Sequence, residues 1–227
     1  MLRIGFIGAG ANARRKHLPN LREIEGVEVT AVCNKHEEST RKVARDFGIP
    51  QTCQNWQEII EMKDLDAVII GTWPYLHCPA TCAAFRAGQH VLVEARMAMN
   101  AAEARRMLEV RTETGMIGQV VPSPFGLRVH DAVKDLLAED FIGDPREVYL
   151  RNLNDRYIYP DSPLHWRLDR ELSGLNTLSL GILNETLQRW LGDTESVLAE
   201  GRTFIEERPD AESGEPRDVM VPDSLSA

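Results

Sequence analysis

The stretch GFIGAGANARRKH, residues 5 to 17, decides how the amino-terminal half of this chain folds. It begins within an apolar run and enters a segment of helical composition, with Gly8, Gly10 and Ala13 at the turn between them. The first glycine permits a tight turn, the second lets the backbone approach a bound pyrophosphate, and the alanine keeps the helix close to the strand. The free N–H groups at the helix start then face the anion. The pattern, which encloses Asn12, predicts a dinucleotide-binding turn, although a glycine-rich turn can also serve packing alone.

Up to residue 121 the chain alternates between short β-branched runs and segments with helical spacing. The expected strands are 2–7, 27–32, 67–70, 90–93 and 117–121, and the expected helices cover roughly 12–24, 37–47, 55–62, 75–87 and 101–114. Strands buried on both faces and joined by crossover helices are typical of a parallel, right-handed, doubly wound sheet. The sequence therefore predicts an α/β Rossmann domain over residues 1–121.

After Pro122 this alternation stops, and residues 122–227 are expected to form a separate α+β domain. Helices are expected at Leu127–Ala138 and Leu175–Trp190, and extended runs at Arg146–Leu153 and Ser196–Ile205. Residues 206–227 are acidic, rich in proline and weakly apolar, so they are expected to be loop or disorder.

Composition limits the classes of partner. The chain has 26 basic and 35 acidic residues, which gives no electrostatic reason to expect nucleic acid or an anionic membrane. No apolar run approaches the roughly 20 residues of a membrane helix, and no signal-peptide pattern opens the sequence. The cysteines are expected to be reduced thiols, and Cys78 and Cys82 suit helix packing better than a metal site. We therefore expect a cytoplasmic protein that acts on a small molecule and holds no metal.

The residues after the second expected strand bear on the choice of nucleotide. An acidic residue there would accept hydrogen bonds from the adenosine ribose and repel a 2′-phosphate. Here Asn34 and Lys35 replace it, so the repulsion is absent and a cation is offered to the phosphate. This predicts binding of NADP at least as strong as that of NAD, unless Lys35 is only a solvated surface charge.

The strand at 67–70 runs into Thr72, Trp73 and, one turn further, His77. These residues are expected at the carboxyl edge of the sheet, where ligands of open parallel sheets bind. An aromatic ring at that edge can stack on a ligand, so Trp73 is a candidate cofactor contact. For His77, ligand contact and helix packing are equal alternatives.

Several ordered motifs resemble the Gfo/Idh/MocA oxidoreductases. Besides the glycine turn and GTWPYLH, these are AGQHVLVEA (87–95), IGDP (142–145) and HWRLDRELSGLNTLSLGI (165–182). The resemblance implies a two-domain NAD(P)-dependent enzyme that transfers hydride to or from a sugar, polyol or related small molecule. It also implies an α+β second domain with a large open sheet, whose outer face often forms oligomers. Residues 122–227 would hold only part of that sheet, as expected of a fragment, a frameshifted product or a diverged short protein, and the open edge favours a homo-oligomer.

The family's catalytic turn reads Glu-Lys-Pro, and here only the glutamate is kept, as Glu94. A lysine with a near-neutral pKa can hold or shuttle the hydroxyl proton during hydride transfer, and Ala95 cannot. Arg96 stays protonated and can orient an anion but cannot act as a base.

The second signature, Asp-x-Gly-x-His, reads Ser179-Leu-Gly-Ile-Leu183. The nearest titratable residue, Glu185, falls on another helix face and is expected to be a surface charge. His165 and Arg167 resemble the family's substrate-side loop and are candidate substrate-binding residues, while the catalytic residues stay unassigned. The alternative to an active oxidoreductase is a nucleotide-binding protein with lost or impaired catalysis.

Overall fold

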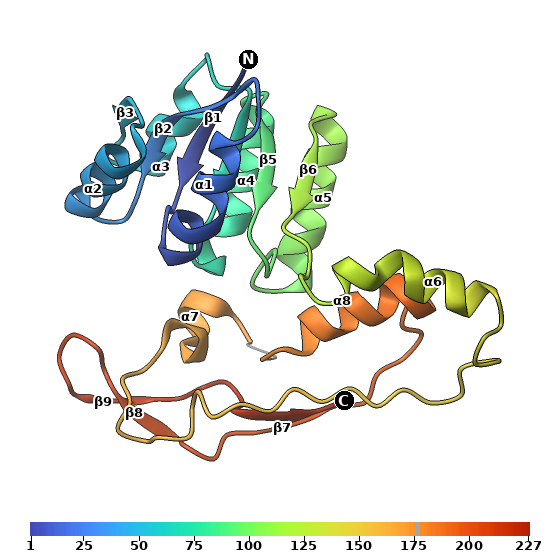
Figure 1. The fold of residues 1–227 in the computed structure, drawn as a ribbon. Helices are drawn as coiled ribbons and strands as arrows, with labels where there is room; N and C mark the ends of the chain where they lie inside the picture. Colours follow the sequence, from blue (N-terminus) through green and yellow to red (C-terminus); the bar gives the residue numbers. More distant parts are fainter. Residues whose placement is uncertain (176–177) are drawn as a thin grey trace. The chain divides into compact units, whose positions relative to one another are not determined.

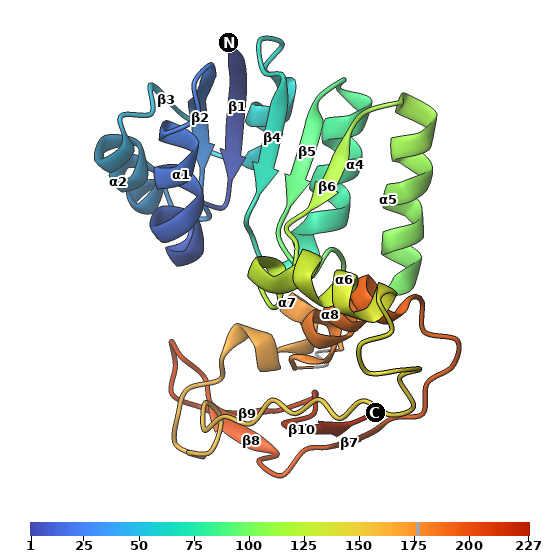
Figure 2. The same cartoon turned by 45° about the vertical axis from the view of Figure 1, so that its right-hand side comes forward.

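The computed structural model describes residues 1–175 and 178–227, which form two compact units, Met1–Val121 and Pro122–Ala227 (Figure 1). The first unit contains a six-stranded sheet of order β3-β2-β1-β4-β5-β6, in which all paired strands are parallel. Its strands are β1 (Leu2–Ile7), β2 (Val27–Cys33), β3 (Gln51–Thr52), β4 (Ala67–Ile70), β5 (His90–Val93) and β6 (Gly118–Val120). This order, visible across Figure 2, confirms the doubly wound Rossmann prediction.

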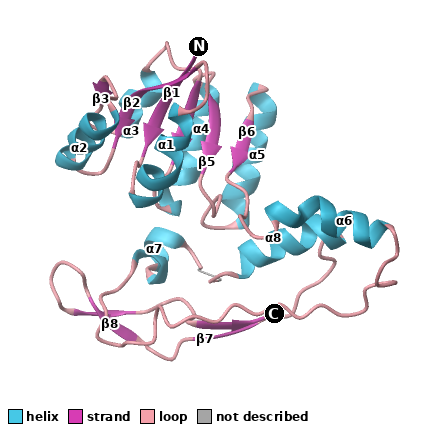
Figure 3. Cartoon of the chain, viewed as in Figure 1, coloured by secondary structure: helices cyan, strands magenta, loops and turns pink. Residues whose placement is uncertain are grey.

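Helices cover both faces of this sheet (Figure 3). A π-helical turn, Ala13–His17, continues into α1 (Leu18–Arg22), followed along the chain by α2 (Glu37–Phe47), α3 (Trp56–Glu61), α4 (His77–Arg86) and α5 (Ala101–Thr114). Period-two burial divides the strands between two cores: Phe6, Val32 and Ile69 pack with α1 and α2. Their neighbours Ile7, Ala31 and Ile70 pack with α3, α4 and α5. The four cysteines are free thiols, and Cys33, Cys78 and Cys82 are buried in the second core.

The second unit combines short helices with two small antiparallel sheets. Its elements are α6 (His130–Ala138), α7 (Arg170–Ser173), α8 (Leu180–Leu191), β7 (Glu200–Arg202), β8 (Glu207–Pro209), β9 (Pro216–Asp218) and β10 (Ser224–Ser226). Strand β10 pairs with β7, and β8 pairs with β9. A 3-10 turn, Leu127–Val129, completes the helix expected at Leu127–Ala138. Within the parts of the chain that the structure covers, no helix combines the length and apolarity needed to cross a membrane.

Three expectations for this unit were wrong in part. The run Arg146–Leu153 forms no strand in the described chain and is solvent-exposed, since none of its backbone groups joins a hydrogen-bond ladder with another described strand. Of Ser196–Ile205, only β7 is a strand. The helix expected to start at Leu175 starts at Leu180, while residues 176 and 177 lie outside the described residues.

The carboxyl-terminal segment 206–227 is ordered, which corrects the expectation of loop or disorder. It forms β8, β9 and β10, and its Val219 and Val221 are buried against Leu164 and Leu168. Composition did not reveal this core because its partners lie about fifty residues away along the chain, outside any local window.

A buried arginine explains much of this order. The side chain of Arg208, on β8, is 2% exposed. Its guanidinium donates hydrogen bonds to the carbonyl oxygens of Tyr157 and Tyr159, the latter at 2.7 Å. The arginine therefore ties the aromatic loop that begins at residue 157 to the terminal hairpin.

Replacing Arg208 with alanine should destabilise this hairpin by about 1 to 3 kcal/mol, because the carbonyl groups of Tyr157 and Tyr159 would lose a charged hydrogen-bond donor. Native-state hydrogen exchange at the β8 and β9 amides measures the change. Arg202→Ala is the matched control, since Arg202 pairs with Glu200 on an exposed strand and should leave the exchange rates near those of the parent. Equal effects of the two substitutions would contradict this role for Arg208.

Candidate functional site

The predicted dinucleotide turn lies at the carboxyl end of β1, between the ends of β2 and β4. Gly8 has a φ of 84°, and a methyl group on it would lie 2.5 Å from Cγ2 and 2.7 Å from the backbone nitrogen of Thr72. The backbone N–H of Gly8 also donates to the carbonyl of Cys33 at 2.8 Å. Only glycine therefore permits this close approach of the turn to the segment after β4.

Gly10 has the opposite environment. A methyl group on it would meet no atom of the described chain within 4 Å, and the residue is exposed. The turn thus presents open space where the first helix begins, next to backbone N–H groups of its first turn. An anion such as a pyrophosphate fits this cradle.

The first helix turn is π-helical, and this geometry determines which polar side chains meet. Hydrogen bonding between residues five positions apart brings their side chains to the same side of the helix, so Asn12 and His17 lie together. The distance between Asn12 Nδ2 and His17 Nε2 is 3.5 Å. Both contact one oxygen of Glu94, which follows β5: Asn12 Nδ2 donates to Oε1 at 2.6 Å, and His17 Nε2 lies 2.5 Å from the same atom. The cluster joins the turn after β1 to the turn after β5.

Glu94 and His17 are largely buried, each with a side chain 18% exposed. Burial alone would raise the pKa of Glu94, but hydrogen bonds from His17 and Asn12, with help from the Ala95 backbone, outweigh it and hold that pKa below its ordinary value. The carboxylate is therefore ionised at neutral pH and fixed in orientation. Sequence reasoning missed His17 because only a π turn brings it to Asn12.

Asn34 and Lys35 take different places at the end of β2. The side-chain oxygen of Asn34 accepts a hydrogen bond from the Ala9 backbone N–H at 2.7 Å, and this contact holds the glycine turn against the end of β2. The ammonium of Lys35 lies over the indole of Trp73, 5.8 Å from its centroid. The structure therefore brings the predicted cation and the predicted aromatic ring together at the carboxyl edge.

His77 is buried at 1% exposure. Its Nδ1 lies 2.8 Å from the carbonyl oxygen of Arg96, and its Nε2 lies 3.0 Å from that of Thr72. Burial lowers the pKa of His77, so the neutral ring donates one of these two contacts. These contacts favour the packing alternative, in which His77 holds the turns after β4 and β5 together.

The candidate substrate residues lie in the second unit. His165 Nδ1 accepts a hydrogen bond from the backbone N–H of Arg167 at 3.2 Å, and the Arg167 guanidinium lies 4.2 Å from the centroid of the Trp166 ring. Burial, together with Arg167 and Arg156, lowers the pKa of His165. The ring thus caps a 3-10 turn in its neutral form.

Glu185, expected to be a surface charge, has a side chain that is 41% exposed but hydrogen-bonded. One of its oxygens accepts a hydrogen bond from the Ser123 backbone at 2.6 Å, and the other pairs with Arg189 at 3.5 Å. The carboxylate therefore anchors the start of the second unit, one helical turn before Arg189 on α8.

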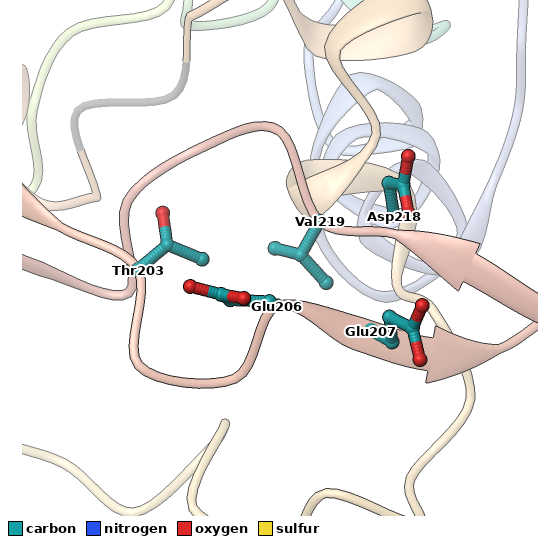
Figure 4. A pocket seen from close by; sticks show the side chains of 5 residues that line it. All are labelled: Thr203, Glu206, Glu207, Asp218 and Val219. Atoms are coloured by element: carbon teal, nitrogen blue, oxygen red, sulfur yellow. The ribbon is translucent and has the colours of Figure 1, made fainter.

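An open cavity of about 500 Å³ also lies in the second unit. Figure 4 shows Thr203, Glu206, Glu207, Asp218 and Val219 around it. Glu207 and Asp218 face each other across the β8–β9 pair. The described residues contain no group of three or more His, Cys, Asp or Glu side chains placed to hold a metal ion.

The sheet order and the glycine turn define a Rossmann nucleotide-binding domain. The model of the Gfo/Idh/MocA family, described as an oxidoreductase family with an NAD-binding Rossmann fold, matches residues 2–121. The chain therefore belongs to the Gfo/Idh/MocA oxidoreductases.

Relatives and solved structures agree with this assignment. A 1,5-anhydro-D-fructose reductase from Ensifer adhaerens is 33% identical over 77% of this chain and 51% of its own length. The crystal structure of an oxidoreductase domain protein from Kribbella flavida is 28% identical, with a TM-score of 0.87 over 99% of this chain and 62% of that one. A 3-ketoreductase variant from Actinomadura kijaniata, solved with TDP-benzene and NADP, is 29% identical with a TM-score of 0.58 over 63% and 44%. The chain spans about half the length of the curated relatives it matches.

Substitution of Gly8 by alanine should lower the free energy of unfolding of the first unit by about 2 to 3 kcal/mol, because the methyl group overlaps Thr72 and the residue has a positive φ. Thermal and denaturant unfolding followed by circular dichroism measures this loss. Gly10→Ala is the matched control and should leave stability nearly unchanged, since its methyl group meets open space. A stable Gly8→Ala variant would show that the turn relaxes away from Thr72.

Proposed function

We propose that this chain binds NADP or NAD at the carboxyl edge of its sheet and transfers hydride to or from a sugar, polyol or related small molecule. The observation that carries the proposal is the open cradle at Gly10, held in place by the close approach of Gly8 to Thr72. Bound NAD(P) supplies the hydride acceptor or donor. Support for a sugar-like substrate comes from the relatives, which include the 1,5-anhydro-D-fructose reductase.

Each candidate residue has a place in this proposal. Gly8, Gly10 and Asn12 would surround the pyrophosphate, Ala13 would keep the helix close to the sheet, and Asn34 with Lys35 would meet the adenosine ribose. Thr72, Trp73 and Glu94 would border the cofactor from the turns after β4 and β5. His77 acts behind them through backbone contacts, and His165 and Arg167 would contact the substrate. The homo-oligomer and the cytoplasmic location expected from the sequence stay predictions.

NADP should bind at least as tightly as NAD. The second strand ends without a carboxylate to repel a 2′-phosphate, and Lys35 is exposed with its ammonium already drawn toward the cofactor edge by Trp73. A charge-assisted contact between this ammonium and a phosphate then favours NADP.

Fluorescence titration with NADPH and NADH tests this preference. Lys35→Glu should weaken NADPH binding by about tenfold or more and NADH binding by less, because it places a carboxylate beside the 2′-phosphate. Lys63→Glu makes the same charge change in an exposed residue before β4, at the opposite edge, and should leave both affinities unchanged. A tenfold preference of the parent for NADH would sink the proposed role of Lys35.

A nucleotide-binding protein without turnover is the second candidate. It is favoured by Ala95 and Leu183, which carry no titratable group at the two positions where the family has lysine and histidine. Only the proton transfer would be lost in that case, and nucleotide binding would remain.

The double substitution Ala95→Lys, Arg96→Pro separates the two candidates. If the parent lacks turnover, restoring the lysine should produce sugar-dependent reduction of NADP, measured by nicotinamide absorbance, with little change in nucleotide affinity. Arg96→Pro alone is the control, since it restores the proline of the family's turn without adding a group that can carry a proton. Equal activity of the parent and the double variant would mean that another group moves the proton.

A further inference from the structure

Hydride transfer from a carbinol also releases the hydroxyl proton, and the two family positions that would handle it are apolar here, as Ala95 and Leu183. At the carboxyl edge of the sheet, His17 and Glu94 form a largely buried titratable pair. We propose that His17, oriented by Glu94, accepts and returns the substrate hydroxyl proton. This inference rests on the proposed oxidoreductase function.

The contacts fix the tautomer of His17. An ionised Glu94 carboxylate can only accept, so Nε2 of His17 carries the hydrogen in their 2.5 Å contact. The Asn12 amide donates to the same carboxylate oxygen at 2.6 Å and holds it in place. The neutral ring then has its lone pair on Nδ1, which has no hydrogen-bond partner within residues 1–175 and 178–227.

A carboxylate behind an imidazole is a known arrangement for proton transfer, because the carboxylate orients the ring and stabilises the imidazolium that forms. The π turn makes the arrangement possible here, since it places His17 above Asn12 and toward Glu94. Phe6, with its ring centroid 6.4 Å from that of His17, packs against the ring from β1. Glu94 itself is a poor acceptor, because its hydrogen bonds favour the ionised form.

The step balances with the groups named. In the oxidation direction, the carbinol carbon loses hydride to bound NADP⁺ or NAD⁺, the oxygen loses its proton to Nδ1 of His17, and the carbon–oxygen double bond forms. The resulting imidazolium is paired with Glu94. In the reduction direction, hydride arrives from the reduced nucleotide and the imidazolium returns the proton.

Nitrogen-15 NMR of the full chain tests the location of His17 independently of turnover. NADP⁺ carries a positive charge on its nicotinamide ring and NADPH does not, so the ring-nitrogen resonances of a His17 beside that ring should differ between the two complexes. His90, at the amino end of β5, is the internal control, and its resonances should be the same in both complexes. Glu94→Gln should shift the Nε2 resonance of His17 in both complexes, because an amide replaces the carboxylate that accepts its hydrogen.

Turnover adds a second readout. His17→Gln can still donate an N–H to Glu94 but cannot accept a proton, so it should keep the NADPH affinity and lower kcat by about a hundredfold or more. His90→Gln should keep both. Identical His17 ring-nitrogen resonances in the two complexes, or unchanged kcat in His17→Gln, overturns this inference and leaves nucleotide binding intact. Failure of the parent to bind either nucleotide overturns the proposed function itself, and this inference with it.

Discussion

The contact between Gly8 and the segment after β4 is the constraint on which the carboxyl edge depends. A side chain at position 8 would overlap the backbone and methyl group of Thr72. The turn can therefore approach the segment after β4 this closely only with glycine at this position. From that position the Ala9 N–H reaches the side chain of Asn34, and the first helix starts with open space above Gly10. The same start brings Asn12 to Glu94, so one steric condition sets both the anion cradle and the polar cluster beneath it.

The local charges at this edge differ from those of the chain as a whole. The sequence has a formal net charge of −9, which opposes binding of an anionic dinucleotide. The edge offsets it with the N-terminus of the first helix and with Lys35, while the carboxylate of Glu94 is hydrogen-bonded to Asn12 and His17. At physiological ionic strength, distant charges are screened beyond about 8 Å, so this local arrangement outweighs the overall charge for a bound pyrophosphate.

Local pattern predicted most of the first unit and missed features that depend on distant contacts. The runs 2–7, 67–70 and 90–93 are apolar and β-branched because both faces of those strands are buried, and their bounds agree with the structure. Strand β3 was missed because it has two residues, both exposed. The order of residues 206–227 depends on a buried Arg208 bound to carbonyl groups about fifty residues earlier, and the link from His17 to Glu94 spans 77 positions. No periodicity encodes such pairs, since each residue alone suits a surface.

Without the family's lysine, the carboxyl edge needs another proton acceptor, and the surroundings of Glu94 determine whether it or His17 can take this role. Burial raises the basicity of a carboxylate, but hydrogen bonds from His17 and Asn12 reverse that direction for Glu94 and keep it ionised. An ionised carboxylate against Nε2 holds the imidazole in one tautomer and leaves the lone pair on Nδ1. The cluster that joins the first helix to the turn after β5 therefore also sets the tautomer of His17 that proton transfer requires, so its structural and chemical roles depend on one contact.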